Sequence, residues 1–234
     1  MSDARRRDAV AQFFVGDLAR PVLADADDHH LRRVLRAREG EEVVVSDGEG
    51  RWALAYVRAG GLEPASEVAA DPAPAPTALY LAPLKGDRSE WAVAKATELG
   101  VARLVPLVAA RGVVRLSEDV AARVRQRWVR VAREAAAQAR RTHLPAIGPA
   151  TPVEDVPLEV VVADFDGPAP WSEITAVAVG PEGGWAPGEW GPQRRRASLG
   201  EGVLRAETAA VAAATLVTLG RRVAGPPATP GSAP

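Results

Sequence analysis

A proline-rich segment at residues 63–77, EPASEVAADPAPAPT, divides this sequence into a short first part and a longer second part. Proline lacks a backbone N–H donor and fixes φ, so such a segment favours an extended connection over a helix or an inner strand. We therefore expect a first domain over residues 1–70, a linker over 71–77 and a second domain over 78–222. The Pro- and Gly-rich end, 223–234, is expected to be a disordered tail.

The first part has the pattern of a small β-rich module. Short apolar runs at 13–15, 42–45 and 52–57 are typical of strands, and Ser46–Gly50 predicts a hairpin turn between the last two. Between the first two runs, residues 25–36 carry acids in the first turn and arginines toward the end, which favours one short helix.

The second part alternates strand and helix patterns over roughly 145 residues, which indicates an α/β domain. Apolar runs at 78–83, 101–108, 160–163 and 176–179 have the length and composition of strands inside a parallel sheet. Helices are expected from a capping box at Asp87–Glu90 to Gly100, from Ser117 to before Pro145, and over 207–220, with a shorter one near Pro187.

Composition excludes several classes of site. The chain has no cysteine and three histidines, so disulfides, thiolate zinc sites and iron–sulfur clusters are excluded and a metal site is not expected. Adjacent His29 and His30 would point in different directions on a helix, which disfavours a shared metal. The net charge of −1 means that any nucleic-acid surface must come from local clustering. No run approaches the roughly 18 apolar residues of a membrane span, and no signal peptide is recognised, so a soluble cytoplasmic protein is expected.

Two glycine-rich stretches mark the expected ligand site. Gly180–Gly184 follows an apolar strand, and Leu199–Arg205 precedes the last helix. Glycines at the carboxyl end of a strand let a ligand approach the backbone, and α/β sheets bind ligands there. A tight turn would explain one such loop equally well. The spacing matches neither a P-loop nor a GxGxxG dinucleotide site.

The same stretches carry a resemblance to a known family. The sequence resembles the paired motifs of the RsmE family at Gly180–Gly184, Leu199–Gly200, Val203–Arg205 and Glu207–Ala209. Members of this family are SPOUT-class enzymes that methylate N3 of a uridine in 16S ribosomal RNA. Further agreement comes from the segments His29–Arg36, Asp47–Gly48, Asp87–Gly100, Trp128, Glu134–Ala135 and Gln138.

The resemblance implies an α/β fold in which a SPOUT domain with a deep trefoil knot follows a small PUA-like β-barrel. It also implies S-adenosylmethionine as cofactor, the small ribosomal subunit as partner and a homodimer without metal. The cofactor-binding residues it suggests are Asp164, Phe165, Gly180, Pro181, Glu182, Gly183, Gly184, Leu199, Gly200, Val203, Leu204, Arg205 and Thr208. Arg205 and Glu207 are the candidate catalytic residues, although Glu207 could simply favour the helix N-terminus. The candidate RNA-binding residues are His30, Arg33, Arg36, Lys85, Arg88 and Arg141.

The chain departs from the family pattern at five positions. The family usually has a basic residue at the position of Gly202, Thr at Ala206 and Met at Ser89. It usually has Glu at the position of Ala137 and Arg at Gln12. Two other functions stay open: a SPOUT enzyme with another RNA target, such as a tRNA ribose 2′-OH, and a non-catalytic RNA-binding or assembly protein. The arginine-rich helix 118–141 could face phosphate, a second subunit or solvent.

Overall fold

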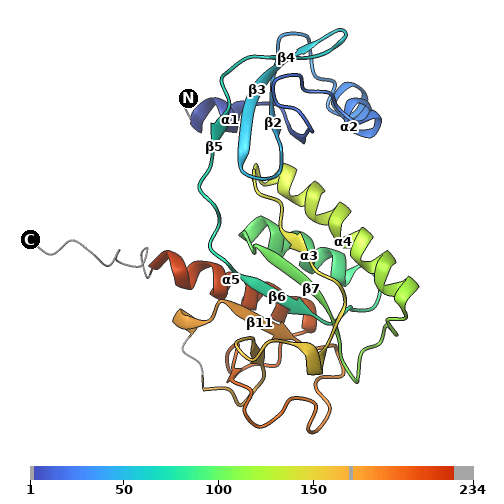
Figure 1. Ribbon diagram of the computed structural model, residues 1–234, viewed down its shortest axis with the longest axis vertical. Coiled ribbons are helices and arrows are strands. Elements are labelled where there is room, and N and C mark those ends of the chain that lie inside the picture. The colour runs from blue at the N-terminus through green and yellow to red at the C-terminus, as the bar shows by residue number, and fades with distance from the viewer. Residues whose placement is uncertain (1–2, 169–170, 224–234) are drawn as a thin grey trace, which may run out of the picture. The chain divides into compact units, whose positions relative to one another are not determined.

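The computed structural model describes residues 3–168 and 171–223 and divides into two compact units (Figure 1). The first unit contains the residues up to 74 together with 132–144, and the second contains 75–131 and the residues from 145 on. A division at one point in the sequence does not describe this arrangement, because the segment 132–144 joins the first unit. Most of the expected tail lies outside the described residues.

The first unit is built on a five-stranded sheet with the order β1-β2-β3-β4, in which β5 also pairs with β3. β1 is parallel to β2, and β2, β3 and β4 form antiparallel hairpins, so the hairpin expected at 46–50 is confirmed. The elements are α1 (Asp3–Asp8), β1 (Gln12–Phe14), α2 (Asp25–His29), η1 (His30–Val34), β2 (Glu42–Ser46), β3 (Arg51–Arg58), β4 (Gly61–Pro64) and β5 (Ala69–Ala70).

Two local expectations for the first unit need correction. The helix expected over 25–36 changes to a π-helix at His30 and ends at Val34, and Arg36 beyond it is a non-glycine residue with φ 53°. Part of the proline-rich segment 63–77 pairs with β3, because β4 extends into it as far as Pro64 and β5 lies within its first half. Pro64 is tolerated as the last residue of β4, and the residues from 65 to 71 contain no proline.

The sheet of the first unit has apolar clusters on both of its faces, because successive apolar side chains of its strands point to opposite faces. Phe13, Val43, Val45 and Ala55 share one cluster with Leu31 of η1. On the other face Val44, Trp52 and Leu54 pack with Ala9, which follows α1. Because successive side chains of a strand point to opposite faces, a single sheet supports both clusters.

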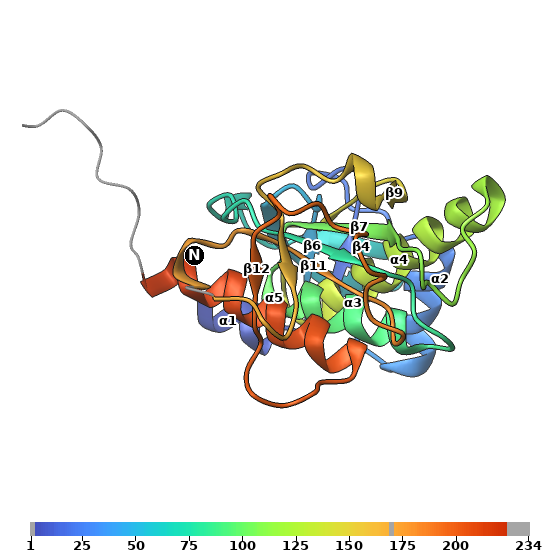
Figure 2. The ribbon, with the colours of Figure 1, turned by 90° about the horizontal axis from the view of Figure 1, so that it is seen from below.

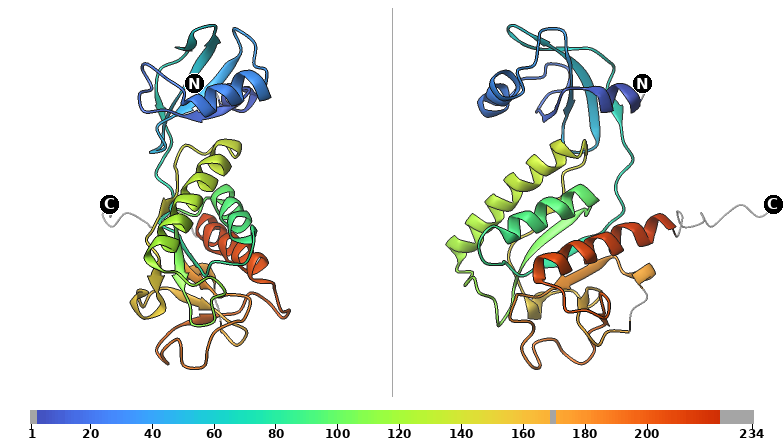
Figure 3. Two further views of the ribbon diagram at one scale, coloured as in Figure 1. Left: turned by 90° about the vertical axis from the view of Figure 1, so that its right-hand side faces the viewer. Right: turned by 180° about the vertical axis from the view of Figure 1, so that it is seen from behind.

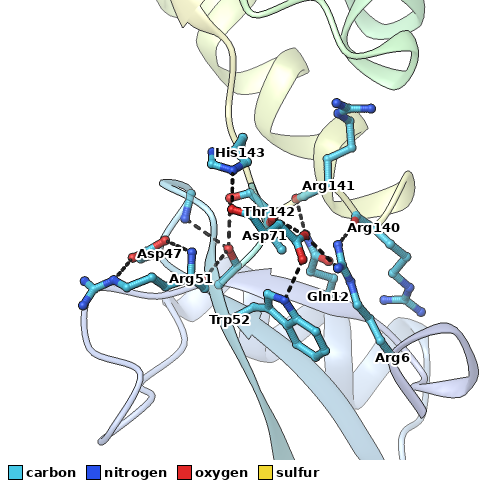
Figure 4. A network of polar contacts seen from close by, with 12 residues as sticks. Arg6, Gln12, Asp47, Arg51, Trp52, Asp71, Arg140, Arg141, Thr142 and His143 are labelled. Carbon is cyan, nitrogen blue, oxygen red and sulfur yellow. Dashed lines mark hydrogen bonds and ion pairs between the residues drawn. The ribbon is translucent and has the colours of Figure 1, made fainter. Parts of the chain in front are cut away.

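A polar network centred on Asp71 joins separate segments of the first unit (Figure 4). The Asp71 carboxylate accepts hydrogen bonds from Arg6 Nη1 (2.8 Å), Trp52 Nε1 (3.1 Å) and Thr142 Oγ1 (2.6 Å). The His143 ring nitrogen Nε2 lies 3.3 Å from the Asp71 carbonyl oxygen. Burial raises the pKa of Asp71, but the hydrogen bonds from Thr142 and Arg6 outweigh it, so that the pKa lies below its ordinary value.

The second unit contains a parallel sheet with the order β12-β10-β11-β6-β7-β8, in which β9 also pairs with β7. Its elements are β6 (Ala78–Leu81), α3 (Arg88–Leu99), β7 (Arg103–Val108), α4 (Glu118–Gln138), β8 (Ala146–Ile147), β9 (Thr151–Pro152), η2 (Val153–Asp155), β10 (Val161–Ala163), η3 (Trp171–Glu173), β11 (Ala176–Val179), β12 (Arg196–Ala197) and α5 (Ala206–Val223), with the last residues of α4 counted in the first unit. The parallel sheet expected from the apolar runs is confirmed, whereas β8, β9 and β12 were not anticipated.

Both faces of this sheet are buried. Helices α3 and α5 lie side by side along one face, where α5 packs against β6 and β11 (Figures 2 and 3). On the other face Tyr80, Val105, Val162 and Ala178 pack against Trp190 and the segment around η2. This explains why β11 is an unbroken apolar run rather than an alternating one.

Two expectations about helices in the second unit were wrong: the capping box at the start of α3 and the short helix near Pro187. Asp87 makes no side-chain capping bond, and Ser89 Oγ instead accepts the buried N–H of Leu84 at 2.7 Å. Residues around Pro187 form turns and not a helix. The end of α3 was correct, because Gly100 has φ 93°, which favours glycine.

Candidate functional site

A cavity of ≈ 960 Å³ lies at the carboxyl ends of β10, β11 and β12 in the second unit. Because the strands are parallel, the segments that follow them meet at one edge of the sheet. The cavity is lined by Arg88, Arg111, Ala163, Asp164, Phe165, Val179, Gly180, Pro181, Glu182, Gly183, Gly184, Trp185, Ala186, Pro187, Gly188, Arg196, Ser198, Leu199, Gly200, Gly202, Val203, Leu204, Arg205, Ala206, Glu207 and Ala209.

The two glycine-rich stretches, which were expected to mark the ligand site, both line this cavity. Of the residues suggested for cofactor binding, all except Thr208 are lining residues. Thr208 is exposed on the first turn of α5, one position beyond Glu207, and successive helical residues point about 100° apart. The functional roles of these residues remain predictions.

Glycine leaves the backbone open where a ligand would need it. A Cβ added to Gly184, Gly200 or Gly202 would meet no atom within 4 Å, so the peptide groups of these residues border open space. Gly184 and Gly200 also have φ values of 65° and 128°, in the region that favours glycine. These stretches can therefore present backbone donors and acceptors to a ligand without intervening side chains.

The side chain of Trp185 packs against the first glycine-rich stretch, Gly180–Gly184. Its indole ring lies 3.0 Å from the position that a Cβ on Gly180 would take, and its Nε1 donates a hydrogen bond to the Ala163 carbonyl at 3.1 Å. The ring of Trp190 contacts it edge-on, with centroids 5.1 Å apart. Trp185 thus connects the loop after β11 with the end of β10.

The acidic lining residues differ in how they are paired. Asp164 forms an ion pair with Arg196, and Glu182 Oε1 lies 3.5 Å from Arg88 Nη1 while also accepting the Lys85 backbone N–H at 3.2 Å. Glu207 is different, because its Oε2 is buried and has no hydrogen-bond partner among the described residues. A buried carboxylate oxygen without a partner is costly, which singles out Glu207 among the acidic residues of the cavity.

Arg205 and the apolar rim are open to solvent. Arg205 is exposed at the cavity, immediately before α5. Phe165 and Val203, which also line the cavity, are 62% and 84% exposed. Large apolar side chains this exposed beside a cavity are typical of a surface that a ligand or partner covers.

The candidate RNA-binding residues are spread over both units. In the first unit, Arg33 and Arg36 are exposed and His30 is half-buried around η1. In the second, Lys85 and Arg88 are exposed on the segment that leads into α3, and Arg88 lines the cavity. Arg141 is half-buried in the first unit, and its carbonyl accepts a hydrogen bond from Gln12 Nε2 at 2.6 Å.

The arginines of α4 and the turn after it are largely engaged within the protein. Arg125 donates to the Ile147 carbonyl, Arg127 pairs with Glu90, and Arg133 donates to the Phe14 carbonyl. Arg140 donates to the Ala9 carbonyl. This pattern weakens the interpretation of the helix as one continuous phosphate-facing surface.

Several cavity residues had no sequence signal that singled them out. Arg111 follows β7 without a recognisable motif, and Arg196 belongs to a run of three arginines whose pairing the sequence does not reveal. Trp185 directly follows Gly184, and a tryptophan beside a glycine-rich stretch is a signal that could have pointed to it. Among residues 3–168 and 171–223, no cluster of three or more His, Cys, Asp or Glu side chains could hold a metal ion. No helix in that part of the chain is long and apolar enough to cross a membrane.

Comparison with known proteins agrees with this architecture. Residues 71–218 match the family model described as an RNA methyltransferase domain, and residues 23–62 match an RNA methyltransferase PUA domain. The chain is 32% identical to ribosomal RNA small subunit methyltransferase E of Mycobacterium bovis over 224 residues, which cover 84% of this chain and 86% of that protein. The match to the protein of the same name from Bacillus subtilis, at 33% identity, covers 51% of this chain and 49% of that protein.

Solved structures show the same fold. Ribosomal RNA small subunit methyltransferase E of Neisseria gonorrhoeae, bound to S-adenosyl methionine, superposes with a TM-score of 0.71 at 27% identity, over 87% of this chain and 94% of that one. A Legionella pneumophila protein in complex with the cofactor SAM gives a TM-score of 0.77 at 25% identity, over 89% and 96%.

Proposed function

The chain belongs to the RNA methyltransferase family, and on that premise we propose that it methylates N3 of a uridine in the 16S ribosomal RNA of the small ribosomal subunit, with S-adenosylmethionine as methyl donor. The observation that carries this proposal is the cavity at the strand ends, where both family-like glycine-rich stretches meet an unpartnered buried carboxylate. Relatives bearing the name ribosomal RNA small subunit methyltransferase E supply the substrate class.

The residues of the cavity fit this cofactor. The open backbone at Gly184, Gly200 and Gly202 can hydrogen-bond an adenine edge, and Phe165, Leu199, Val203 and Leu204 offer apolar contact. When bound, S-adenosylmethionine supplies a methyl group on a positively charged sulfur, which makes that carbon electrophilic. Glu182, which accepts the Lys85 N–H, fixes the first glycine-rich stretch against the segment before α3.

Arg205 and Glu207 have the chemistry that uridine N3 requires. This nitrogen carries an imide proton and becomes nucleophilic only when that proton leaves, so the enzyme needs a proton acceptor and a positive charge beside the base. Glu207 lines the cavity, and its carboxylate is the proposed acceptor because its Oε2 accepts no hydrogen bond from the described residues. The exposed guanidinium of Arg205 would stabilise the negative charge on the base or bind a flanking phosphate.

The finer architecture is part of the same proposal. We propose a deep trefoil knot within residues 78–222, a PUA-like β-barrel over residues 1–70 with a linker to 77, and a homodimer that acts in the cytoplasm. The knot is proposed from the resemblance to the SPOUT class, and the close approach of Gly167 to β12, where a Cβ would lie 2.2 Å from the Ala197 nitrogen, is compatible with it. His30, Arg33, Arg36, Lys85, Arg88 and Arg141 are proposed to contact the RNA.

The test is to incubate the full chain with labelled S-adenosylmethionine and small ribosomal subunits that lack the modification, and to identify the methylated nucleoside by mass spectrometry. Label in N3-methyluridine is the expected result. Arg205→Ala should lower the rate at least tenfold, whereas Arg103→Ala, at the amino end of β7 and away from the cavity, should leave it unchanged. Label in another nucleoside would overturn the proposed target, and absence of label despite cofactor binding would contradict the proposed activity.

A further inference from the structure

The charges around the cavity do not balance. Seven of its lining residues are charged, and they are Arg88, Arg111, Asp164, Glu182, Arg196, Arg205 and Glu207. Two ion pairs, Asp164 with Arg196 and Glu182 with Arg88, account for four of them. Arg111, Arg205 and Glu207 remain without an ion pair in the part of the chain that the structure describes.

The cofactor cannot neutralise the remaining arginines. S-adenosylmethionine carries a sulfonium, an ammonium and a carboxylate near pH 7, so its net charge is about +1. Adding it to two arginines and one glutamate increases the positive charge of the site. An RNA strand brings one negative charge with each phosphate, so the second substrate offers an anion that these exposed arginines can bind.

Arg111 is held in a position to meet such an anion. Its Nη1 donates a hydrogen bond to the Gly183 carbonyl at 3.2 Å, which leaves the other donors of the guanidinium for a ligand. The turn that carries it is fixed by Glu189, whose carboxylate accepts the N–H of Ala110 at 2.5 Å and that of Ala186 at 2.7 Å. The side chain is exposed, so an RNA strand can reach it without displacing protein.

We propose that Arg111 binds a backbone phosphate of the RNA substrate next to the nucleotide that enters the cavity. The planar guanidinium can form two parallel hydrogen bonds with a phosphate, which fixes the strand in register. This inference rests on the proposed function, since it assumes an RNA substrate. It assigns to the turn after β7 a role in substrate positioning beside the cofactor loops.

The experiment measures binding of small ribosomal subunits lacking the modification, by filter binding with S-adenosylhomocysteine present, over a series of KCl concentrations at fixed Mg²⁺. Arg111→Gln should weaken binding about tenfold and reduce the slope of log K against log salt concentration by roughly 0.7–0.9, the value for one phosphate contact. Arg111→Lys should restore the slope because it keeps the charge. Arg103→Gln, at the other end of β7, is the matched control and should behave as wild type.

The affinity for S-adenosylmethionine, measured by calorimetry without RNA, separates this role from a role in the cofactor site. We expect it to stay within about twofold of wild type in all three variants. Unchanged subunit binding by Arg111→Gln, or a loss confined to cofactor affinity, would overturn the proposal. Methylation is assayed separately on the same protein preparations, with S-adenosylmethionine in place of S-adenosylhomocysteine, and it tests the proposed function: a protein that binds subunits through Arg111 without methylating them would contradict that function alone.

Discussion

Trp185 Nε1 donates a hydrogen bond to the Ala163 carbonyl at 3.1 Å, and this bond joins the loop after β11 to the last residue of β10. Both residues line the cavity, although they are 22 positions apart in the sequence. The same indole packs beneath Gly180, where a Cβ would lie 3.0 Å from the ring. One side chain therefore sets the spacing between two of the segments that would enclose the cofactor.

Trp185→Phe should reduce cofactor affinity more than it reduces stability. Phenylalanine retains ring packing beneath Gly180 but leaves the half-buried Ala163 carbonyl without its donor, at a cost of about 1 kcal/mol. We expect the affinity for S-adenosylmethionine to fall about three- to tenfold by calorimetry. The control Trp91→Phe changes a tryptophan on α3 that is 47% exposed. Equal cofactor affinity for both variants would contradict the positioning role.

Gly167→Ala should disrupt the crossing between the segment after β10 and β12. The added Cβ would lie 2.2 Å from the Ala197 nitrogen, and the Ser198 N–H donates to the Gly167 carbonyl at 3.1 Å, so neither backbone can move without losing a contact. We expect destabilisation by more than about 3 kcal/mol in urea denaturation. Gly16→Ala, where a Cβ meets nothing within 4 Å, is the control. A Gly167→Ala protein as stable as Gly16→Ala would show that this crossing tolerates a side chain.

Asp71→Asn should destabilise the protein at neutral pH and lose this effect in acid. The Asp71 carboxylate accepts hydrogen bonds from three side chains, and its pKa lies below its ordinary value near 3.9. A group with a lowered pKa in the folded state stabilises it above the unfolded pKa, and that contribution disappears as the pH falls through the folded pKa.

The free energy of unfolding of wild type and Asp71→Asn, measured by urea denaturation, should therefore differ by about 1–3 kcal/mol between pH 5 and 8. The difference should shrink progressively below about pH 4, as the carboxyl is protonated. A difference that does not depend on pH would indicate that the substitution acts through packing and not through the charge of Asp71.

Ser89→Ala should destabilise the segment that leads into α3. Ser89 is 4% exposed and its Oγ accepts the N–H of Leu84, which is itself buried, so alanine leaves a buried donor without a partner. The expected cost is about 1–3 kcal/mol in thermal or urea unfolding, with faster hydrogen exchange at the Leu84 amide. Wild-type exchange at that amide in Ser89→Ala would refute this account.

Local residue patterns were enough to predict most of the secondary structure and the two glycine-rich stretches that line the cavity. Apolar runs such as Ala176–Val179 predict strands because a parallel sheet covered on both faces needs side chains that are apolar on both sides. Gly184 and Gly200 indicate open backbone because only glycine gives this freedom at no steric cost. Such patterns depend on neighbours a few residues away, so they can be recognised in one sequence.

Contacts between residues far apart in the chain could not be predicted from these local patterns. β12 is two residues long within a run of polar residues, and it exists because β10 pairs with it. The segment 132–144 joins the first unit through contacts such as Thr142 with Asp71, 71 positions apart. Arg111 reaches the cavity through Glu189 and Gly183, and the isolation of Glu207 Oε2 follows from burial. These features depend on contacts between segments far apart in the chain, and no local pattern of residue types encodes such contacts.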